Sequence, residues 1–124
     1  IVTNEIHFST NNLPLGSYQM VPNIKRRVGK LSTDSNKYGV ELMVDIKDTP
    51  EQRFPLNLFV KITGIFEIDG ENEEEINEFL KLQGVQMVYP YLRSLVSNIT
   101  SSSLLQPIIL PIINVLDFKE ISDE

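Results

Sequence analysis

A change of hydrophobic period in the middle of the chain constrains the fold more than any other feature of the sequence. From residue 37 to 47, apolar and polar side chains alternate strictly, and the segment 56–68 repeats this alternation. Beyond Asp69-Gly70 the apolar residues recur with helical spacing instead, at positions 88, 92, 95, 96 and 99. Strands therefore come first along the chain, and helices follow them.

Weaker patterns complete this outline. Shorter strands are expected over residues 4–9 and 24–31, and helices over 73–82 and 88–99, with Gly84 as an interruption and Pro90 near the start of the second helix. Segregated strands and helices indicate an α+β fold, in which a four-stranded antiparallel sheet carries helices packed on one face. We expect residues 1–124 to form one domain whose last six residues, 119–124, are frayed.

Composition excludes several classes of function. The chain has no cysteine and a single histidine, His7, so we expect no thiol nucleophile, no metal site and no cofactor. There is no glycine-rich phosphate loop and no grouping of catalytic side chains, so we expect a protein that is not an enzyme. The lack of cysteine and of a signal peptide favours a cytoplasmic location.

Charge and hydropathy exclude two further kinds of partner. The net charge is −6, with +1 in residues 1–50 and −7 in residues 51–124, which argues against nucleic acid because phosphate binding requires positive potential. The most apolar stretch, residues 104–116, is too short to span a bilayer and contains Pro107 and Pro111, so no membrane insertion is expected. Because prolines remove backbone donors, this stretch can expose apolar side chains without acting as an aggregating edge strand.

Three motifs on this pattern resemble the SecB protein-export chaperone family. They are the strand end Gly64-Ile65-Phe66-Glu67-Ile68, the helix segment Val88-Tyr89-Pro90-Tyr91-Leu92-Arg93 and the later run Leu110-Pro111-Ile112-Ile113-Asn114. Their order and spacing match the family over residues 56–116. The resemblance implies a SecB-like fold and an ATP-independent holdase that binds unfolded or presecretory polypeptides and passes them to the export motor. It also implies a homotetramer built as a dimer of dimers.

The resemblance, together with the apolar excess near the end of the chain, suggests which residues form the site. The expected client groove consists of Phe79, Met87, Tyr89, Tyr91, Leu105, Ile108, Ile109, Leu110, Ile112 and Ile113. The expected oligomer interface consists of Phe59, Ile65, Leu92 and Val96. Core packing is the alternative for the tyrosines, core or interface packing for residues 104–116, and scattered surface apolar residues for Phe59 and Ile65.

The sequence also departs from the family pattern. Asn57 and Phe59 stand where acidic positions that contact the motor are expected, and the family's longer C-terminal helix is shortened after Phe118. These departures leave an alternative, namely a SecB-fold assembly or antitoxin-associated protein with one dedicated partner. Promiscuous capture of many unfolded clients distinguishes the first hypothesis from the second.

Overall fold

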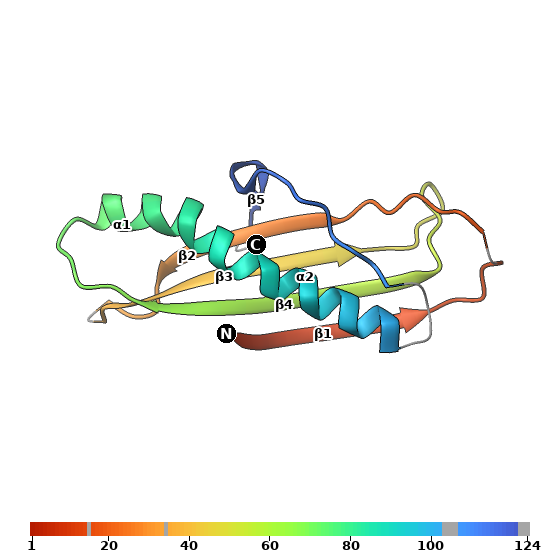
Figure 1. Cartoon of the computed structure of the whole chain (residues 1–124), viewed down its shortest axis with the longest axis horizontal. Helices are drawn as coiled ribbons and strands as arrows, with labels where there is room; N and C mark the ends of the chain where they lie inside the picture. Colours follow the sequence, from red (N-terminus) through yellow and green to blue (C-terminus); the bar gives the residue numbers. More distant parts are fainter. Residues whose placement is uncertain (15, 34, 103–106, 122–124) are drawn as a thin grey trace.

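A five-stranded sheet carries one long helix and an extended C-terminal segment on the same face (Figure 1). The computed structural model describes residues 1–14, 16–33, 35–102 and 107–121. The strand order is β1-β4-β3-β2-β5, antiparallel except for the parallel pair β2–β5. The strands are β1 (Val2–Thr10), β2 (Asn23–Lys30), β3 (Lys37–Ile46), β4 (Leu56–Glu67) and β5 (Lys119–Glu120). The α+β class is confirmed, with one short strand more than expected.

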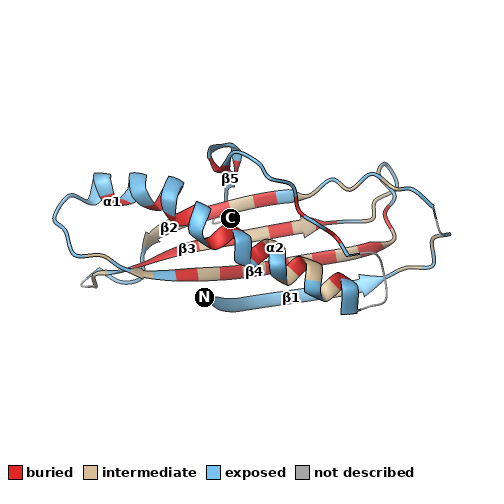
Figure 2. Cartoon of the chain, viewed as in Figure 1, coloured by how far each residue is buried: buried red, intermediate tan, exposed pale blue. Residues whose placement is uncertain are grey.

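The two alternating segments form the centre of the sheet. β3 and β4 pair so that Val44 lies beside Val60 and Leu42 beside Ile62, which places the apolar faces of both strands on the same side. These side chains are almost completely buried beneath the helix. Figure 2 shows this alternation of buried and less buried residues along the central strands, whereas β1 at the edge of the sheet is exposed over nearly its whole length.

One continuous helical rod replaces the two helices expected from the sequence. It consists of α1 (Glu73–Phe79), the π-helical segment η1 (Leu80–Gly84) and α2 (Val85–Ser102). The Asn72 side chain caps its start by accepting a hydrogen bond from the Glu75 amide at 3.2 Å. The expected interruption at Gly84 is wrong, because the chain widens there into a π turn and continues. A side chain at Gly84 would place its Cβ 3.1 Å from Val40 Cγ2, so glycine lets the helix lie close to the sheet.

The position of Pro90 follows from this continuity. It lies inside the helix and not near its beginning. Its ring is on the exposed side of the helix, where water can solvate the backbone carbonyl that loses its partner.

The last described residues return to the sheet. After an extended segment, the 3₁₀ turn η2 (Val115–Asp117) leads into β5, which pairs in parallel with Lys25 and Arg26 of β2. The Ile121 amide donates to the Arg26 carbonyl at 2.9 Å. Fraying over 119–121 is therefore not observed, because these backbone groups are hydrogen-bonded to an edge strand, while residues 122–124 lie outside the described residues.

Candidate functional site

The extended segment that follows the helix, residues 107–118, is the candidate site, and we call it the tail. Its side chains divide between core and solvent. Ile108, Leu110, Val115 and Phe118 are buried, whereas the side chains of Ile109 and Ile112 are 69% and 87% exposed. One segment thus anchors itself with one set of aliphatic groups and presents another to solvent.

Polar side chains of α2 hold the first part of the tail by its backbone. The Tyr89 hydroxyl donates to the Pro111 carbonyl at 2.6 Å, and Arg93 Nε donates to the Leu110 carbonyl at 2.9 Å. Ser97 Oγ donates to the Ile108 carbonyl at 2.8 Å. Side chains of the helix therefore take the place of a neighbouring strand, and the tail stays extended without joining the sheet.

Thr100 completes this ladder from the next turn of the helix. Its hydroxyl oxygen accepts a hydrogen bond from the Ile108 amide at 2.8 Å and donates within its own helix to the Val96 carbonyl at 2.9 Å. Thr100 is completely buried, so this bond is shielded from water.

Arg26 and Phe118 hold the second part of the tail. Arg26 Nη1 donates to the Val115 carbonyl at 3.1 Å and to the Lys81 carbonyl of η1 at 2.7 Å. The rings of Phe118 and Tyr89 pack edge to face with centroids 5.2 Å apart. The tail is thus held at both ends, with Ile109 inside the first held part and Ile112 between the two held parts.

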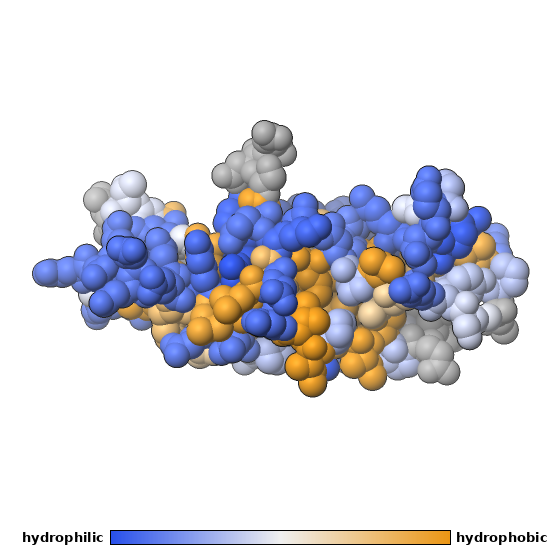
Figure 3. All heavy atoms as spheres, turned by 90° about the horizontal axis from the view of Figure 1, so that it is seen from above, coloured by the Kyte–Doolittle hydropathy of each residue, from blue (hydrophilic) through white to orange (hydrophobic). Residues whose placement is uncertain are grey.

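Two shallow furrows lie along the tail. The furrow on the α2 side has a volume of about 250 Å³ and is lined by Gln86, Tyr89, Pro90, Arg93, Ile112, Ile113, Asn114 and Val115. The furrow on the β2 side has a volume of about 390 Å³ and is lined by Val21, Pro22, Asn23, Ile24, Pro111, Ile113, Asp117, Phe118 and Lys119. Ile113 lines both, so it forms a ridge between them. Figure 3 shows hydrophobic side chains gathered in the middle of the molecule between hydrophilic ends.

The electrostatics of the site favour hydrogen bonding over acid–base chemistry. Burial raises the pKa of the Tyr89 hydroxyl above its ordinary value of 10.0, against a smaller opposing effect of the positive Arg93. The hydroxyl therefore stays protonated at neutral pH and keeps its hydrogen bond to the tail.

The structure divides the expected groove residues into two sets. Those with exposed side chains are Phe79, Met87, Tyr91, Ile109, Ile112 and Ile113. Those that are buried are Tyr89, which holds the tail from α2, and Ile108 and Leu110, which anchor the tail itself in the core. Leu105 lies outside the described residues. Ile108 and Leu110 thus contribute position and not contact surface, whereas Tyr89 also lines the α2-side furrow.

The expected interface residues also divide. Ile65 is half exposed and Phe59 is partly buried on the sheet face opposite the helix, where Phe59 packs near His7. Leu92 and Val96 have no exposed surface, because the helix buries them against its own sheet. These two side chains belong to the core of the chain and offer nothing to a second copy.

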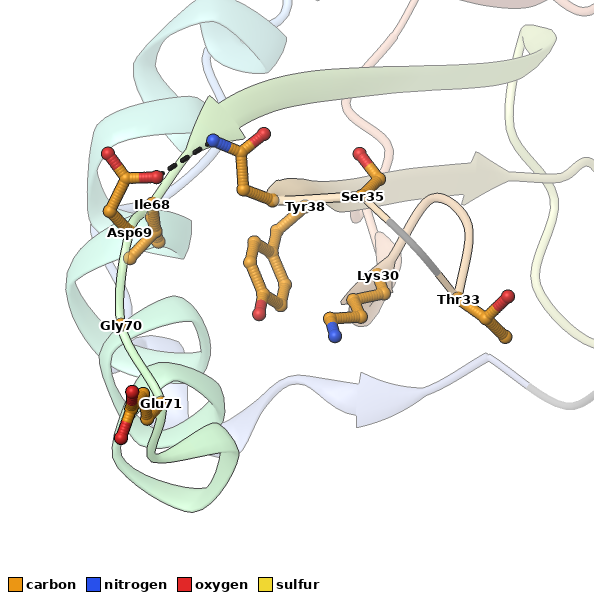
Figure 4. Close-up of a pocket in the computed structure, with 9 residues that line it drawn as sticks. Lys30, Thr33, Ser35, Tyr38, Ile68, Asp69, Gly70 and Glu71 are labelled. Carbon is orange, nitrogen blue, oxygen red and sulfur yellow. Dashed lines mark hydrogen bonds between the residues drawn. The ribbon is translucent and has the colours of Figure 1, made fainter.

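A third hollow lies at the far end of the sheet, away from the tail (Figure 4). Its volume is about 380 Å³, and Lys30 and Tyr38 point into it. The Lys30 amine pairs with Glu73 at 2.9 Å, and Asn36 donates to Asp69 at 2.9 Å. These pairs join the β2–β3 hairpin to the first residue of α1 and to the loop before it, so the hollow is explained by the anchoring of these segments.

Within residues 1–14, 16–33, 35–102 and 107–121, no three metal-ligating side chains cluster together. In the same part of the chain, no helix combines the length and apolar character that crossing a bilayer requires.

Sequence reasoning named Tyr89 and Arg93 without assigning them to the tail backbone, and it missed Ser97 and Thr100. Tyr89, Arg93, Ser97 and Thr100 form a mixed polar stripe along α2, at a spacing that puts them on one side of the helix beside its apolar face. That spacing was a usable signal. Arg26 gave a weaker signal, because a charged residue within a strand pattern is ordinarily explained as protection of an edge strand against pairing with other chains.

Sequence comparison with protein families supports the fold described above. The family model described as preprotein translocase subunit SecB matches residues 5–121. An uncharacterized protein of Methanocaldococcus jannaschii is 25% identical over 130 residues, covering 99% of this chain and 84% of that protein. The protein-export protein SecB of Orientia tsutsugamushi is 29% identical over 94 residues, covering 76% of this chain and 56% of that protein. The alignment thus spans little more than half the length of this SecB relative.

A solved structure supports the fold from geometry. The Mycobacterium tuberculosis SecB-like chaperone, solved in complex with a peptide from an antitoxin, superposes with a TM-score of 0.73. The superposition covers 90% of this chain and 86% of that chain at 17% identity. At this identity the likeness concerns the arrangement of strands and helix and not the residues of a binding site.

Proposed function

This chain belongs to the SecB family, and from that premise we propose that it is an ATP-independent holdase that binds non-native or presecretory polypeptides along the tail. Membership of this family supports a chaperone-type role, and no enzyme activity is proposed. What the chain itself adds is a surface suited to extended, apolar segments of many sequences.

The single observation that carries the proposal is the exposure of Ile109 and Ile112 on a tail whose backbone is held in place. The backbone carbonyls of the neighbouring Ile108, Leu110 and Pro111 are hydrogen-bonded to side chains of α2, so these two side chains are presented on an extended, positioned backbone. Burying them against a client yields about 25 cal/mol per Å² of apolar area. Because such burial has no directional requirement, the site tolerates different client sequences.

The furrows on both sides of Ile113 support the same proposal. Each is open and shallow, so an extended chain can lie in it without a deep pocket selecting one side chain. Met87 and Tyr91 add exposed apolar surface on the helix, at 56% and 57% exposure. Methionine suits varied partners because its unbranched side chain adapts to irregular surfaces.

A homo-oligomer is part of the proposal. β1 lies at the edge of the sheet with nearly all of its residues exposed, and Ile65 is half exposed on the open sheet face. An unpaired edge strand is a surface on which a second copy can add. We propose a homotetramer, a dimer of dimers in the cytoplasm, with the export motor as one partner.

The second candidate function is a protein with one dedicated partner. The observation that favours it is the structural neighbour, a SecB-like chaperone whose solved complex holds an antitoxin peptide. The same tail and furrows fit one peptide as well as many clients. Promiscuity separates the two candidates.

The test measures aggregation of several chemically unfolded clients by light scattering, without nucleotide, at near-stoichiometric amounts of this protein. We expect delayed aggregation for clients of unrelated sequence. The double variant Ile109→Ser, Ile112→Ser should lose the effect, whereas Leu31→Ser should keep it. Leu31 is a matched control because its side chain is about half exposed but lies at the β2–β3 hairpin, far from the tail.

The outcomes discriminate between the candidates. No delay with any client contradicts the holdase proposal, and capture of one peptide alone favours the dedicated partner. The same scattering measurement gives the mass of the protein, and a strictly monomeric mass contradicts the proposed tetramer.

A further inference from the structure

Arg26 is a buried cation on the inward face of β2. The alternation of this strand points its side chain toward the core, between Ile24 and Val28. Its side chain is only 9% exposed. Within the described part of the chain it is the one charged residue that is buried. A buried charge is costly unless it is paired and hydrogen-bonded, so its partners require an explanation.

The partners of Arg26 come from three other elements. Nη1 donates to the Lys81 carbonyl of η1 at 2.7 Å and to the Val115 carbonyl of η2 at 3.1 Å. Nε donates to Glu120 of β5 at 3.2 Å, and this carboxylate supplies the compensating charge. One side chain therefore joins the sheet, the helical rod, the second part of the tail and the strand β5 that follows it.

The chemistry of the guanidinium suits this junction. Its planar fork presents donors in fixed, divergent directions. A lysine amine at the same place has one nitrogen and cannot reach acceptors that Nη1 and Nε approach from different sides. The close approach of η1 to the sheet at Gly84 brings the rod near β2 at this level, with Lys81 in reach of Arg26.

We propose that Arg26 is the positioning residue of the client site, a latch that sets where the second half of the tail lies. This inference rests on the proposed holdase function. Val115, whose carbonyl Arg26 binds, lines the α2-side furrow. Lys119 lines the β2-side furrow, and its backbone pairs with that of Lys25, the residue before Arg26 in β2. Moving the latch therefore changes the walls of both furrows, although Arg26 itself is too buried to touch a client.

The experiment compares Arg26→Lys with Glu120→Gln and with Arg27→Lys as the matched control. Arg27 is the next residue of the same strand, and its guanidinium pairs with Glu41 at 3.1 Å on the opposite face of the sheet. Three quantities are measured for each protein: the thermal midpoint, hydrogen exchange of the Asp117 and Phe118 amides, and the dissociation constant for one unfolded client. These amides bond to the Asn114 and Val115 carbonyls within the η2 turn, so their exchange reports local opening of this part of the tail.

For Arg26→Lys we expect exchange of these amides to rise about tenfold or more, because loss of the latch frees a local unit of low stability. We expect the dissociation constant for the client to rise by about threefold or more. The second part of the tail is then docked in only a fraction of the molecules, and only that fraction binds the client. Glu120→Gln keeps an acceptor and should give smaller changes in the same direction. Arg27→Lys should leave both quantities at the wild-type level.

The outcomes separate the latch from a merely structural role and from failure of the holdase proposal. A structural role lowers the thermal midpoint and the folded fraction but leaves the dissociation constant of the folded protein unchanged, and that result overturns the inference. Unchanged tail exchange in Arg26→Lys overturns it as well. If the wild type binds no client, the holdase proposal fails, whereas equal client binding by the wild type and Arg26→Lys overturns the latch alone.

Discussion

β4 and the tail are both extended and rich in branched aliphatic residues, yet the structure uses them in opposite ways. β4 pairs with a strand on each side and buries Leu56, Leu58, Val60 and Ile62 on one face. The tail has prolines at 107 and 111, is held by side chains of a helix, and leaves isoleucines in solvent. Aliphatic composition alone therefore does not decide whether an extended segment becomes core or binding surface. The hydrogen-bond partners of its backbone decide it.

The difference also concerns stability. A strand inside the sheet opens only when neighbouring strands separate, whereas a segment held by a few side-chain hydrogen bonds can open locally. A binding surface benefits from such independence, because it can adjust to a client without unfolding the sheet.

The same substitution in the two regions should have its largest effect in the sheet. Leu58 and Leu110 are both almost completely buried. Leu58→Ala should reduce the free energy of unfolding by about 2–5 kcal/mol, because it leaves a cavity in a rigid core. Leu110→Ala should cost less, since the tail can shift to fill the space. Urea unfolding of both variants measures this, and equal costs would show that tail and sheet unfold as one unit.

Removing the acceptor beneath the tail should have an intermediate effect. Thr100→Val leaves the buried Ile108 amide without its hydrogen bond, which costs about 1–3 kcal/mol. We expect faster hydrogen exchange at Ile108 and along the tail, with little change in β3 and β4. Ser101→Ala is the control, because its hydroxyl bonds only within the helix, to the Ser97 carbonyl. Equal acceleration in the sheet would contradict a separate tail unit.

Acid should destabilise the sheet through Asp48, which lies in the connection between β3 and β4. Hydrogen bonds from Arg53, and then from the Phe54 amide, hold the pKa of the Asp48 carboxyl below its ordinary value of 3.8. A depressed pKa means that Asp48 contributes stability above pH 3.8, and this contribution is lost as pH falls through the lower folded pKa. The effect should be smaller than the first two, because Arg53 is half exposed and salt screens the pair.

The measurement is acid unfolding of the wild type and of Asp48→Asn. The wild type should lose stability below pH 4 more steeply than the variant, which has no carboxyl group to protonate at this position. Asp48 joins the β3–β4 connection to Asn11 after β1, so the loss should appear at that end of the sheet. Equal acid sensitivity of the two proteins contradicts this role for Asp48.

The sequence allowed most of the sheet to be predicted and only part of the site. Strict alternation predicted β3 and β4 within a residue or two, because one-sided burial leaves a period of two in the sequence. The break at Gly84 was mispredicted, since a glycine that permits close packing and one that ends a helix look alike without the facing Val40. β5 was missed because two residues carry no period and owe their pairing to tertiary contacts with Arg26.

The tail shows the same limit in finer detail. Its apolar excess was visible in the sequence, but its division into buried Ile108 and Leu110 and exposed Ile109 and Ile112 was not. Prolines interrupt the alternation, and the hydrogen bonds that set its orientation come from Arg93 and other side chains of α2. Long-range side-chain contacts of this kind leave no period in the sequence.

Changing the shape of a side chain without loss of apolar area should have the smallest effect, and this effect should differ between β4 and the tail. In β4, Ile62→Leu disturbs a close-packed core and should cost up to about 1.5 kcal/mol. In the tail, Ile112→Leu should change the free energy of unfolding by less than about 0.5 kcal/mol, because the side chain is 87% exposed. Client affinity should also stay unchanged, since burial of apolar area does not depend on branching. A clear loss of affinity for several clients would mean that the site recognises the shape of Ile112, as a dedicated partner requires.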